Sequence, residues 1–219
     1  MQIAPDTELI HFNDWTLRVR RSSHPAPRLL LLIHGYTGDE NSMWVFARDL
    51  PSQYWMIAPR APYPAEMGGY SWRPLRPGTF GRPALAELLP SAEALIRLVD
   101  EYSASAGFDA AVFDLMGFSQ GAAMCNVLAF HYPHRIRKVG ILAGFVPDGL
   151  DAWISKRPLE GKSFFVTHGT RDELVPLDRA RHSITLLERA GAQVTYCEDD
   201  VGHKVSVNCL RVLKDFFGD

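Results

Sequence analysis

A serine between two glycines is the residue whose surroundings most strongly indicate chemistry. Gly117-Phe118-Ser119-Gln120-Gly121 follows a short apolar run and precedes an alanine-rich segment with helical spacing. This is the Gly-x-Ser-x-Gly pattern of a nucleophilic serine held in a tight turn between a strand and a helix. Small residues on both sides let strand and helix approach, and the helix N-terminus favours negative charge at the serine. A plain turn with Ser119 as N-cap is the alternative interpretation.

A base and an acid are the partners that such a serine needs, because its hydroxyl is too weak an acid to attack a carbonyl unaided. His203 lies in the loop after the last predicted strand, and Asp172 lies in the loop after the preceding one. Loops that follow parallel strands open at the same edge of a sheet, so these side chains can converge. The order Ser119, Asp172, His203 is that of an α/β-hydrolase triad.

Other histidines and acids are weaker candidates because of their positions. His131 and His134 lie at the far end of the helix that starts beside Ser119, about 18 Å away. His168 ends a strand near the site and is expected to pack against the acid loop. The remaining weaker candidates lie on helices, at the N-terminal edge or on the loops already named: His11, His24, His182, Glu173, Asp178, Asp199 and Asp200.

Two backbone N–H groups are needed to bind the oxyanion of a tetrahedral intermediate. The amide of Gln120, directly after the serine, is the first candidate. The second is the amide of Tyr36, in the glycine-containing loop from His34 to Glu40. A glycine-rich turn without a ligand is the alternative. A phosphate-binding loop is disfavoured because no Gly-Lys-Ser/Thr follows.

Short β-rich runs alternate with helical patterns along the chain, and they would position these loops. This alternation predicts an α/β fold with a mostly parallel central sheet flanked by helices. The first two runs flank the turn pair Asn13-Asp14 and predict a hairpin at the sheet edge. The predicted strands are 8–12, 15–20, 28–33, 55–58, 111–116, 139–143, 163–167 and 194–198, and the predicted helices are 41–50, 85–106, 120–131, 177–190 and 205–217. No repeat or low-complexity linker divides residues 1–219, so we expect one domain.

Composition excludes several classes of protein. The 219 residues include 23 basic and 25 acidic ones, with a net charge of −2 and 47% hydrophobic residues. A folded core is therefore expected, and a nucleic-acid footprint is not. The longest apolar run, residues 29–33, is too short for a bilayer, and the N-terminus does not resemble a secretory signal. Three cysteines without metal-ligand spacing, Cys125, Cys197 and Cys209, are expected to pack as unpaired small hydrophobes. We therefore predict a reducing, cytoplasmic location and no metal or cofactor.

These motifs together resemble the phospholipase/carboxylesterase family of α/β-hydrolases, which includes small bacterial carboxylesterases and acyl-protein thioesterases. The matching segments are residues 32–40, 117–121, His168-Gly169 with Asp172 and Val175-Pro176, and Gly202-His203. The resemblance implies cofactor-free hydrolysis of esters, thioesters or lysophospholipids, with Tyr36 and Gln120 as oxyanion donors. Acyl-protein thioesterases usually have leucine where this chain has Tyr36, and this difference weighs against long acyl chains. Related small esterases can be dimers, so a homodimer is open.

The proline- and glycine-rich segment 59–83 is predicted to be a long ordered loop on the catalytic side of the sheet. We expect its Tyr70 and Trp72, with Met67 and Phe80, to wall the substrate pocket, although these side chains could instead anchor the loop. Phe145 and Val175, from two later loops, are the remaining predicted pocket residues.

The overall prediction is a serine hydrolase that cleaves small, soluble esters of short to medium acyl chains through an acyl-enzyme. The length leaves no room for a separate lid domain, which favours an open site. A thioesterase or lysophospholipase on the same triad is the main alternative. An acyltransferase or a non-catalytic binding module is a more distant one.

Overall fold

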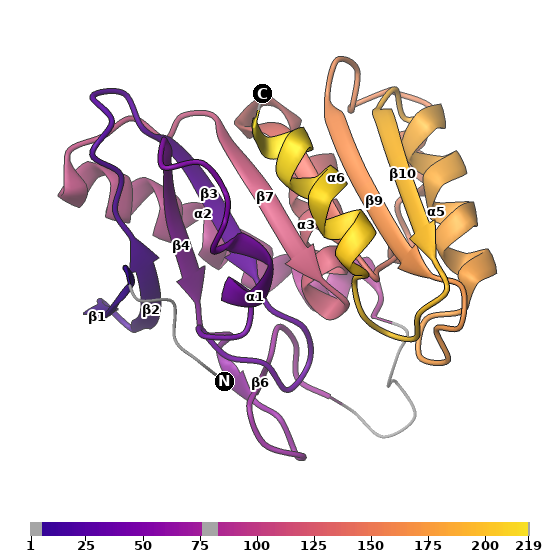
Figure 1. The fold of residues 1–219 in the computed structure, drawn as a ribbon, viewed down its shortest axis with the longest axis horizontal. Coiled ribbons are helices and arrows are strands. Elements are labelled where there is room, and N and C mark those ends of the chain that lie inside the picture. The colour runs from indigo at the N-terminus through magenta and orange to yellow at the C-terminus, as the bar shows by residue number, and fades with distance from the viewer. Residues whose placement is uncertain (1–5, 76–82, 219) are drawn as a thin grey trace.

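An eight-stranded sheet forms the centre of the computed structural model, which describes residues 6–75 and 83–218 (Figure 1). Its strands lie in the order β1-β2-β4-β3-β7-β8-β9-β10. The bounds are β1 Glu8–Phe12, β2 Trp15–Arg20, β3 Arg28–Ile33, β4 Tyr54–Pro59, β7 Phe113–Phe118, β8 Ile136–Leu142, β9 Ser163–Gly169 and β10 Gln193–Asp199. Six neighbouring strands pair in parallel, namely β4, β3, β7, β8, β9 and β10 in their order across the sheet. Strand β2 pairs antiparallel with β1 and with β4. The predicted mostly parallel sheet and its edge hairpin are therefore confirmed.

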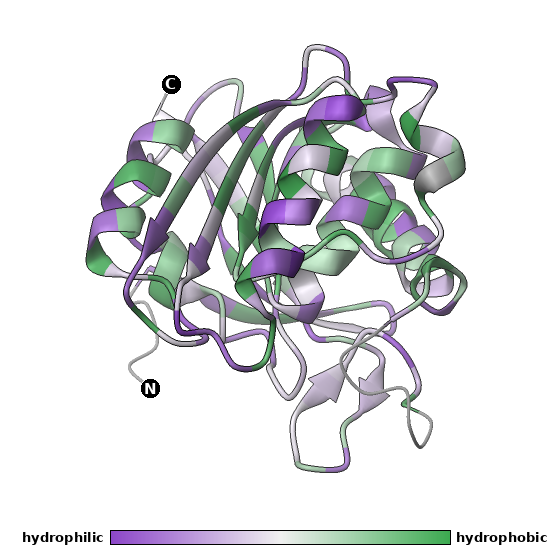
Figure 2. Cartoon of the chain, turned by 90° about the vertical axis from the view of Figure 1, so that its right-hand side faces the viewer, coloured by the Kyte–Doolittle hydropathy of each residue, from purple (hydrophilic) through white to green (hydrophobic). Residues whose placement is uncertain are grey.

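Helices cover both faces of this sheet. In chain order they are α1 Trp44–Ala47, α2 Leu85–Ala106, α3 Gln120–His131, α4 Asp151–Ile154, α5 Leu177–Arg189 and α6 Val207–Gly218, with a 3₁₀ turn at Pro133–Arg135. Side chains of α2, α3 and α5 pack in one core cluster, and those of α1 and α6 pack in the other. In β3, Leu29 and Leu31 belong to the first cluster, whereas Leu30 and Leu32 belong to the second. A strand covered on both faces is continuously apolar for this reason (Figure 2).

Two predicted elements differ from the structure in ways that local hydrogen bonds explain. The helix expected over 41–50 is reduced to α1, because the Asp39 carboxylate accepts hydrogen bonds from the amide of Asn41 and the hydroxyl of Ser42. Such side-chain bonds hold the backbone in a turn that competes with a helix. Segment 59–83, expected to lack regular structure, contains a small hairpin of β5 Tyr63–Pro64 and β6 Tyr70–Ser71.

The small hairpin lies beyond the carboxyl ends of the parallel strands, at the lower end of the sheet in Figure 1. Gly68 and Gly69 turn the chain between its two strands with φ values of 88° and 70°. Glycine adopts this left-handed region without a steric penalty, which is why the turn forms here. Phe80, one of the predicted pocket residues, lies outside the described residues.

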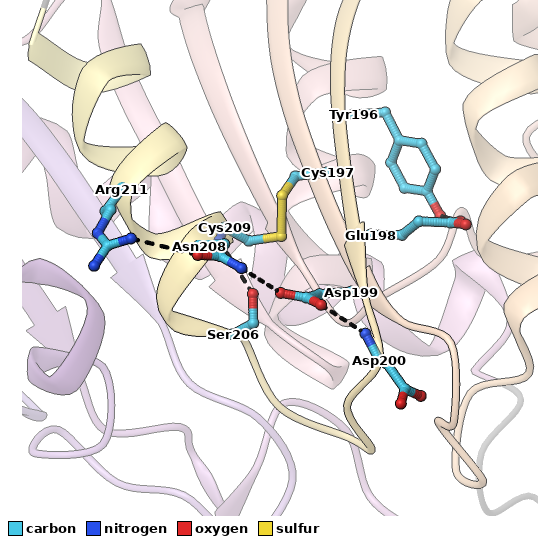
Figure 3. The surroundings of a disulfide bond; sticks show 9 residues. All are labelled: Tyr196, Cys197, Glu198, Asp199, Asp200, Ser206, Asn208, Cys209 and Arg211. Atoms are coloured by element: carbon cyan, nitrogen blue, oxygen red, sulfur yellow. Dashed lines mark hydrogen bonds between the residues drawn. A yellow bond between two sulfur atoms is a disulfide. The ribbon is translucent and has the colours of Figure 1, made fainter.

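A disulfide joins Cys197 in β10 to Cys209 in α6 (Figure 3). The prediction that all three cysteines are unpaired is therefore wrong for these two, whereas Cys125 is free and fully buried. The loop after β10 brings the first turn of α6 back alongside the strand, with 5.7 Å between the two Cα atoms. Disulfides persist in oxidising compartments, so the cysteines no longer support the predicted cytoplasmic location.

No helix among residues 6–75 and 83–218 is long and apolar enough to cross a membrane. Within the same ranges, no group of three or more histidine, cysteine, aspartate or glutamate side chains is arranged to hold a metal ion.

Candidate active site

Ser119 occupies a strained turn between β7 and α3. Its backbone lies at φ 54° and ψ −113°, a conformation that costs a non-glycine residue energy and persists only where the surroundings enforce it. A Cβ atom at Gly117 would lie 2.3 Å from the carbonyl oxygen of Gly121, and one at Gly121 would lie 2.0 Å from that of Ile33. The two glycines therefore allow the strand and the helix to meet behind the serine, as the sequence pattern predicts.

Asp172 is a buried carboxylate whose two oxygens are both occupied. Oδ1 accepts hydrogen bonds from the amides of Leu174 and Val175, each at 2.9 Å. Oδ2 accepts a hydrogen bond from Nδ1 of His203 at 2.7 Å and lies 3.3 Å from Nε2 of His168. A carboxylate can only accept here, so the proton of the neutral His203 ring is held on Nδ1. Nε2 of His203 is then the nitrogen that can take a proton.

His168 packs against the loop that carries Asp172. Its side chain is fully buried, and its Nε2 donates to the carbonyl oxygen of Val175 at 2.8 Å. The same nitrogen lies against Asp172, so His168 links the strand β9 to both ends of the turn that presents the carboxylate. This placement matches the packing role expected for His168.

Ser119 and His203 line the same cavity, and the ring of Phe118 lies 5.0 Å from the His203 ring, centroid to centroid. The hydrogen bonds among the described residues include none between the Ser119 hydroxyl and the imidazole. A serine–base contact that is open in a ligand-free site commonly tightens when substrate binds. The structure thus joins the predicted acid and base directly, and the predicted nucleophile lines the same cavity as the base.

The two predicted oxyanion donors also line this cavity. Gln120 is the first residue of α3, where amide groups have no partner within the helix. Its side chain is fixed, because Oε1 accepts from the amide of Trp72 at 2.9 Å and Nε2 donates to the hydroxyl of Ser71 at 3.1 Å. Tyr36 reaches the cavity from the loop after β3.

His34 holds the loop of Tyr36 in place. Its Nδ1 donates to the carbonyl oxygen of Gly35 at 2.7 Å, and its Nε2 accepts from the amide of Ala61 at 3.1 Å. These two bonds require the neutral ring. Burial lowers the pKa of His34 below its ordinary value, so the neutral form is favoured.

The cavity beside Ser119 has a volume of about 450 Å³. Three predicted pocket residues, Met67, Phe145 and Val175, line it. The further lining residues that sequence reasoning did not single out are Thr37, Arg73, Leu75, Pro83, Phe118 and Leu174. Phe118 directly precedes the predicted nucleophile and Leu174 lies two residues after the predicted acid, and this closeness in sequence is the signal that could have identified them. Arg73 is fully buried, with Nη1 donating to Glu87 at 2.8 Å.

Trp72 and Tyr70 are placed differently from the prediction. Trp72 is 0% exposed, packs against the ring of His34 and donates from Nε1 to the His34 carbonyl oxygen at 2.8 Å. Tyr70 lies under the guanidinium of Arg60 and lines a separate cavity. Both side chains therefore anchor segment 59–83 to the body, which is the alternative role that the sequence left open.

Comparisons with known proteins bear on the family and the fold of this chain. The sequence profile of the phospholipase/carboxylesterase family matches residues 16–218. A carboxylesterase from Mesorhizobium loti superposes with a TM-score of 0.81 at 22% identity, covering 96% of this chain and 97% of that one. The Bacillus cereus carboxylesterase superposes with a TM-score of 0.82 at 23% identity, covering 94% of each chain. Acyl-protein thioesterase 1 from Debaryomyces hansenii is 28% identical over 228 residues, which span 93% of this chain and 95% of the relative.

Proposed function

The chain belongs to the phospholipase/carboxylesterase family, and from this premise we propose that it hydrolyses short- to medium-chain carboxylic esters with Ser119, His203 and Asp172. Its fold is the α/β-hydrolase fold, and its activity is that of a hydrolase of the carboxylesterase type. The substrate range and the roles of individual residues are the proposal.

The proposed reaction starts with attack of the Ser119 hydroxyl on the ester carbonyl. His203 takes the serine proton on Nε2 and then gives it to the leaving alcohol, while Asp172 stabilises the imidazolium. The amides of Tyr36 and Gln120 donate to the oxyanion. Water, activated by the same imidazole, hydrolyses the acyl-enzyme and restores the serine.

The hydrogen bond between Asp172 and His203 carries this proposal. It joins a fully buried carboxylate to an imidazole that is 16% exposed, on the cavity that Ser119 also lines. A buried carboxylate paired to a histidine keeps Nε2 ready to accept a proton. The strained turn at Ser119 supports the same reading, because backbone strain of this kind clusters at functional sites.

The lining and the volume of the cavity support the proposal that the substrates carry small acyl groups. Phe145, Phe118 and Val175 supply apolar wall, and Tyr36 adds a ring with a polar tip. A volume of about 450 Å³ lies at the lower end of the range for sites that enclose a small ligand.

A second candidate function is acyl-thioester hydrolysis. The observation that favours it is the likeness to a protein named acyl-protein thioesterase 1 along nearly the whole chain. The same nucleophile and base would serve an ester or a thioester, so chain-length profiles of p-nitrophenyl esters and of acyl thioesters separate the two functions.

Ester hydrolysis by the purified protein tests the proposal. We expect turnover to be fastest with p-nitrophenyl esters of two to eight carbons, and Ser119→Ala to lower kcat by about 10³-fold or more. Ser105→Ala, at an exposed position in α2, is the matched control and should leave kcat unchanged. A loss below tenfold in Ser119→Ala would overturn the assignment of the nucleophile.

A further inference from the structure

A disulfide closes the base of the loop that carries His203. Cys197 and Cys209 are separated by 12 residues, and His203 lies midway between them. The chain leaves β10 after Asp199 and enters α6 at Val207. Any displacement of the first turn of α6 relative to β10 is therefore passed to His203 through only a few residues.

The first turn of α6 depends on this bond more than the rest of the helix does. The buried side chains of α6 are Cys209, Leu213 and Phe217, which form one stripe at helical spacing. Leu213 and Phe217 pack in the core beneath the middle and the end of the helix. In the first turn Val207 is 66% exposed and Leu210 is only partly buried against the same core, so Cys209 is the fully buried side chain among residues 207–210.

Polar contacts accompany the disulfide at this junction, one of them exposed and one buried. Nδ2 of Asn208 donates to Oδ2 of Asp199 at 3.1 Å, on the solvent side of the same junction (Figure 3). The hydroxyl of Ser206 accepts from the amide of Cys209 at 3.1 Å in a buried hydrogen bond, and the same hydroxyl faces the Asp199 carboxylate at the end of β10, whose pKa it helps to lower. Water competes with the exposed bond between Asn208 and Asp199, so that contact is weaker than the covalent link between the first turn of α6 and β10.

The two halves of the loop are held differently. Before His203, the carbonyl oxygens of Asp199 and Val201 accept from the amides of Thr170 and Arg171, which join the loop to the strand end that presents Asp172. After His203, the amide of Lys204 bonds back to Gly202 at 2.7 Å, within the loop itself. The second half of the loop contacts the core through the partly buried Val205 and then continues into α6, whose first turn the disulfide ties to β10.

We propose that the Cys197–Cys209 disulfide positions His203 for proton transfer, so that its reduction lowers turnover while the substrate cavity persists. This inference rests on the proposed function, because it requires His203 to act as the base. The cavity residues other than His203 come from segments that the disulfide does not join, so substrate binding should change little. A loss of alignment at the base would lower kcat, since catalysis depends steeply on such geometry.

The redox step requires an external thiol reductant. A dithiol thiolate attacks the sulfur of Cys197, the more exposed partner, and releases Cys209 as a thiolate that takes up a proton. The second thiol of the reductant then attacks the mixed disulfide, which releases Cys197. In total the dithiol gives two electrons and two protons, and it leaves as a cyclic disulfide.

The test compares the oxidised protein, the protein reduced with dithiothreitol and the reoxidised protein. Acid release from methyl butyrate in a pH-stat is the readout, because it does not respond to free thiols. We expect reduction to lower kcat about tenfold, to leave KM within twofold and to be reversed by reoxidation. Labelling by a fluorophosphonate should slow in parallel. Circular dichroism and the thermal midpoint show that the reduced protein is folded at the assay temperature.

Variants separate this disulfide from the third cysteine. Cys197→Ser with Cys209→Ser should reproduce the reduced kcat and no longer respond to dithiothreitol. Cys125→Ala keeps the disulfide and should still lose and regain activity with the redox state. If the serine pair does not fold, Cys197→Ala with Cys209→Val keeps the buried stripe of α6 apolar, and the same criterion applies to it.

The outcomes distinguish this inference from the proposed function. A folded protein without the crosslink whose kcat stays within threefold of the oxidised value overturns the positioning role and leaves the proposed function intact. An oxidised protein that neither hydrolyses esters nor reacts with a fluorophosphonate overturns the proposed function, and the positioning role with it.

Discussion

Asp172→Asn is the substitution that most sharply separates a catalytic acid from a structural one. Three hydrogen bonds reach this carboxylate, from the amides of Leu174 and Val175 to Oδ1 and from the ring of His203 to Oδ2, and Nε2 of His168 lies 3.3 Å from Oδ2. Asparagine offers one accepting oxygen and one donating nitrogen. It can therefore satisfy either the two backbone amides or the two imidazole rings, but it places a donor against the other two groups. The backbone amides are fixed, whereas an imidazole can exchange its tautomer, so the amide nitrogen is expected to face the two rings.

The size of the effect follows from that orientation. With a donor opposite Nδ1, the neutral His203 ring places its proton on Nε2, where it can no longer accept the proton of Ser119. Exchanging aspartate for asparagine in a serine–histidine–aspartate triad lowers kcat by about 10⁴-fold. At 1.36 kcal/mol for each factor of ten, this is about 5 kcal/mol of activation free energy.

The assay is the hydrolysis of p-nitrophenyl butyrate, with kcat and KM measured separately and folding checked by circular dichroism. Glu173→Gln is the matched control: it removes one negative charge at the next residue, which is exposed, and should change kcat less than twofold. A loss below tenfold in Asp172→Asn, or an equal loss in Glu173→Gln, would refute the reasoning.

Three other substitutions test the framework around the site. Gly121→Ala places a Cβ atom 2.0 Å from a backbone carbonyl of β3, so we expect a thermal midpoint at least 10 °C lower, seen by calorimetry, or no soluble protein. Asp114→Ala leaves the Arg137 guanidinium without its buried partner and should cost about 3–5 kcal/mol in urea denaturation. It should leave kcat unchanged, because five strand residues put it about 16 Å from the serine. Burial alone would raise the pKa of Glu40, but the hydrogen bond from Arg60 lowers it overall, so this pair adds stability that is lost as the pH falls below about 4. Thermal midpoints of Glu40→Gln should therefore fall less steeply than those of the parent between pH 6 and pH 3.5, and an unchanged slope would contradict this.

The positions of Ser119, Asp172 and His203 could be predicted because each follows a strand whose type the sequence makes plain. Continuous apolar runs and alternating helices indicate a parallel sheet, and the ends of parallel strands meet at one edge. The need for glycine on both sides of the serine could also be predicted. In the structure, the short distance between Gly121 and the carbonyl of Ile33 leaves no room for a side chain.

Features that depend on how elements dock were not predictable in the same way. An aromatic residue in a proline-rich loop can face a cavity or the core, and Trp72 faces the core because its indole nitrogen reaches the carbonyl of His34. The pairing of Cys197 with Cys209 depends on the register of α6 against β10, which neither residue's local sequence encodes. Four of the residues that line the cavity, Thr37, Arg73, Leu75 and Pro83, come from two separate parts of the chain and converge only in the folded protein.

The most direct test of the central claim is to identify the residue that a fluorophosphonate modifies. The protein would be inactivated with diisopropyl fluorophosphate, digested and mapped by mass spectrometry, with the loss of esterase activity followed in the same sample. The account predicts one adduct per chain, on Ser119, with activity lost in proportion to labelling. Full activity with Ser119 unmodified by the reagent, or inactivation that tracks an adduct on another residue, would contradict it.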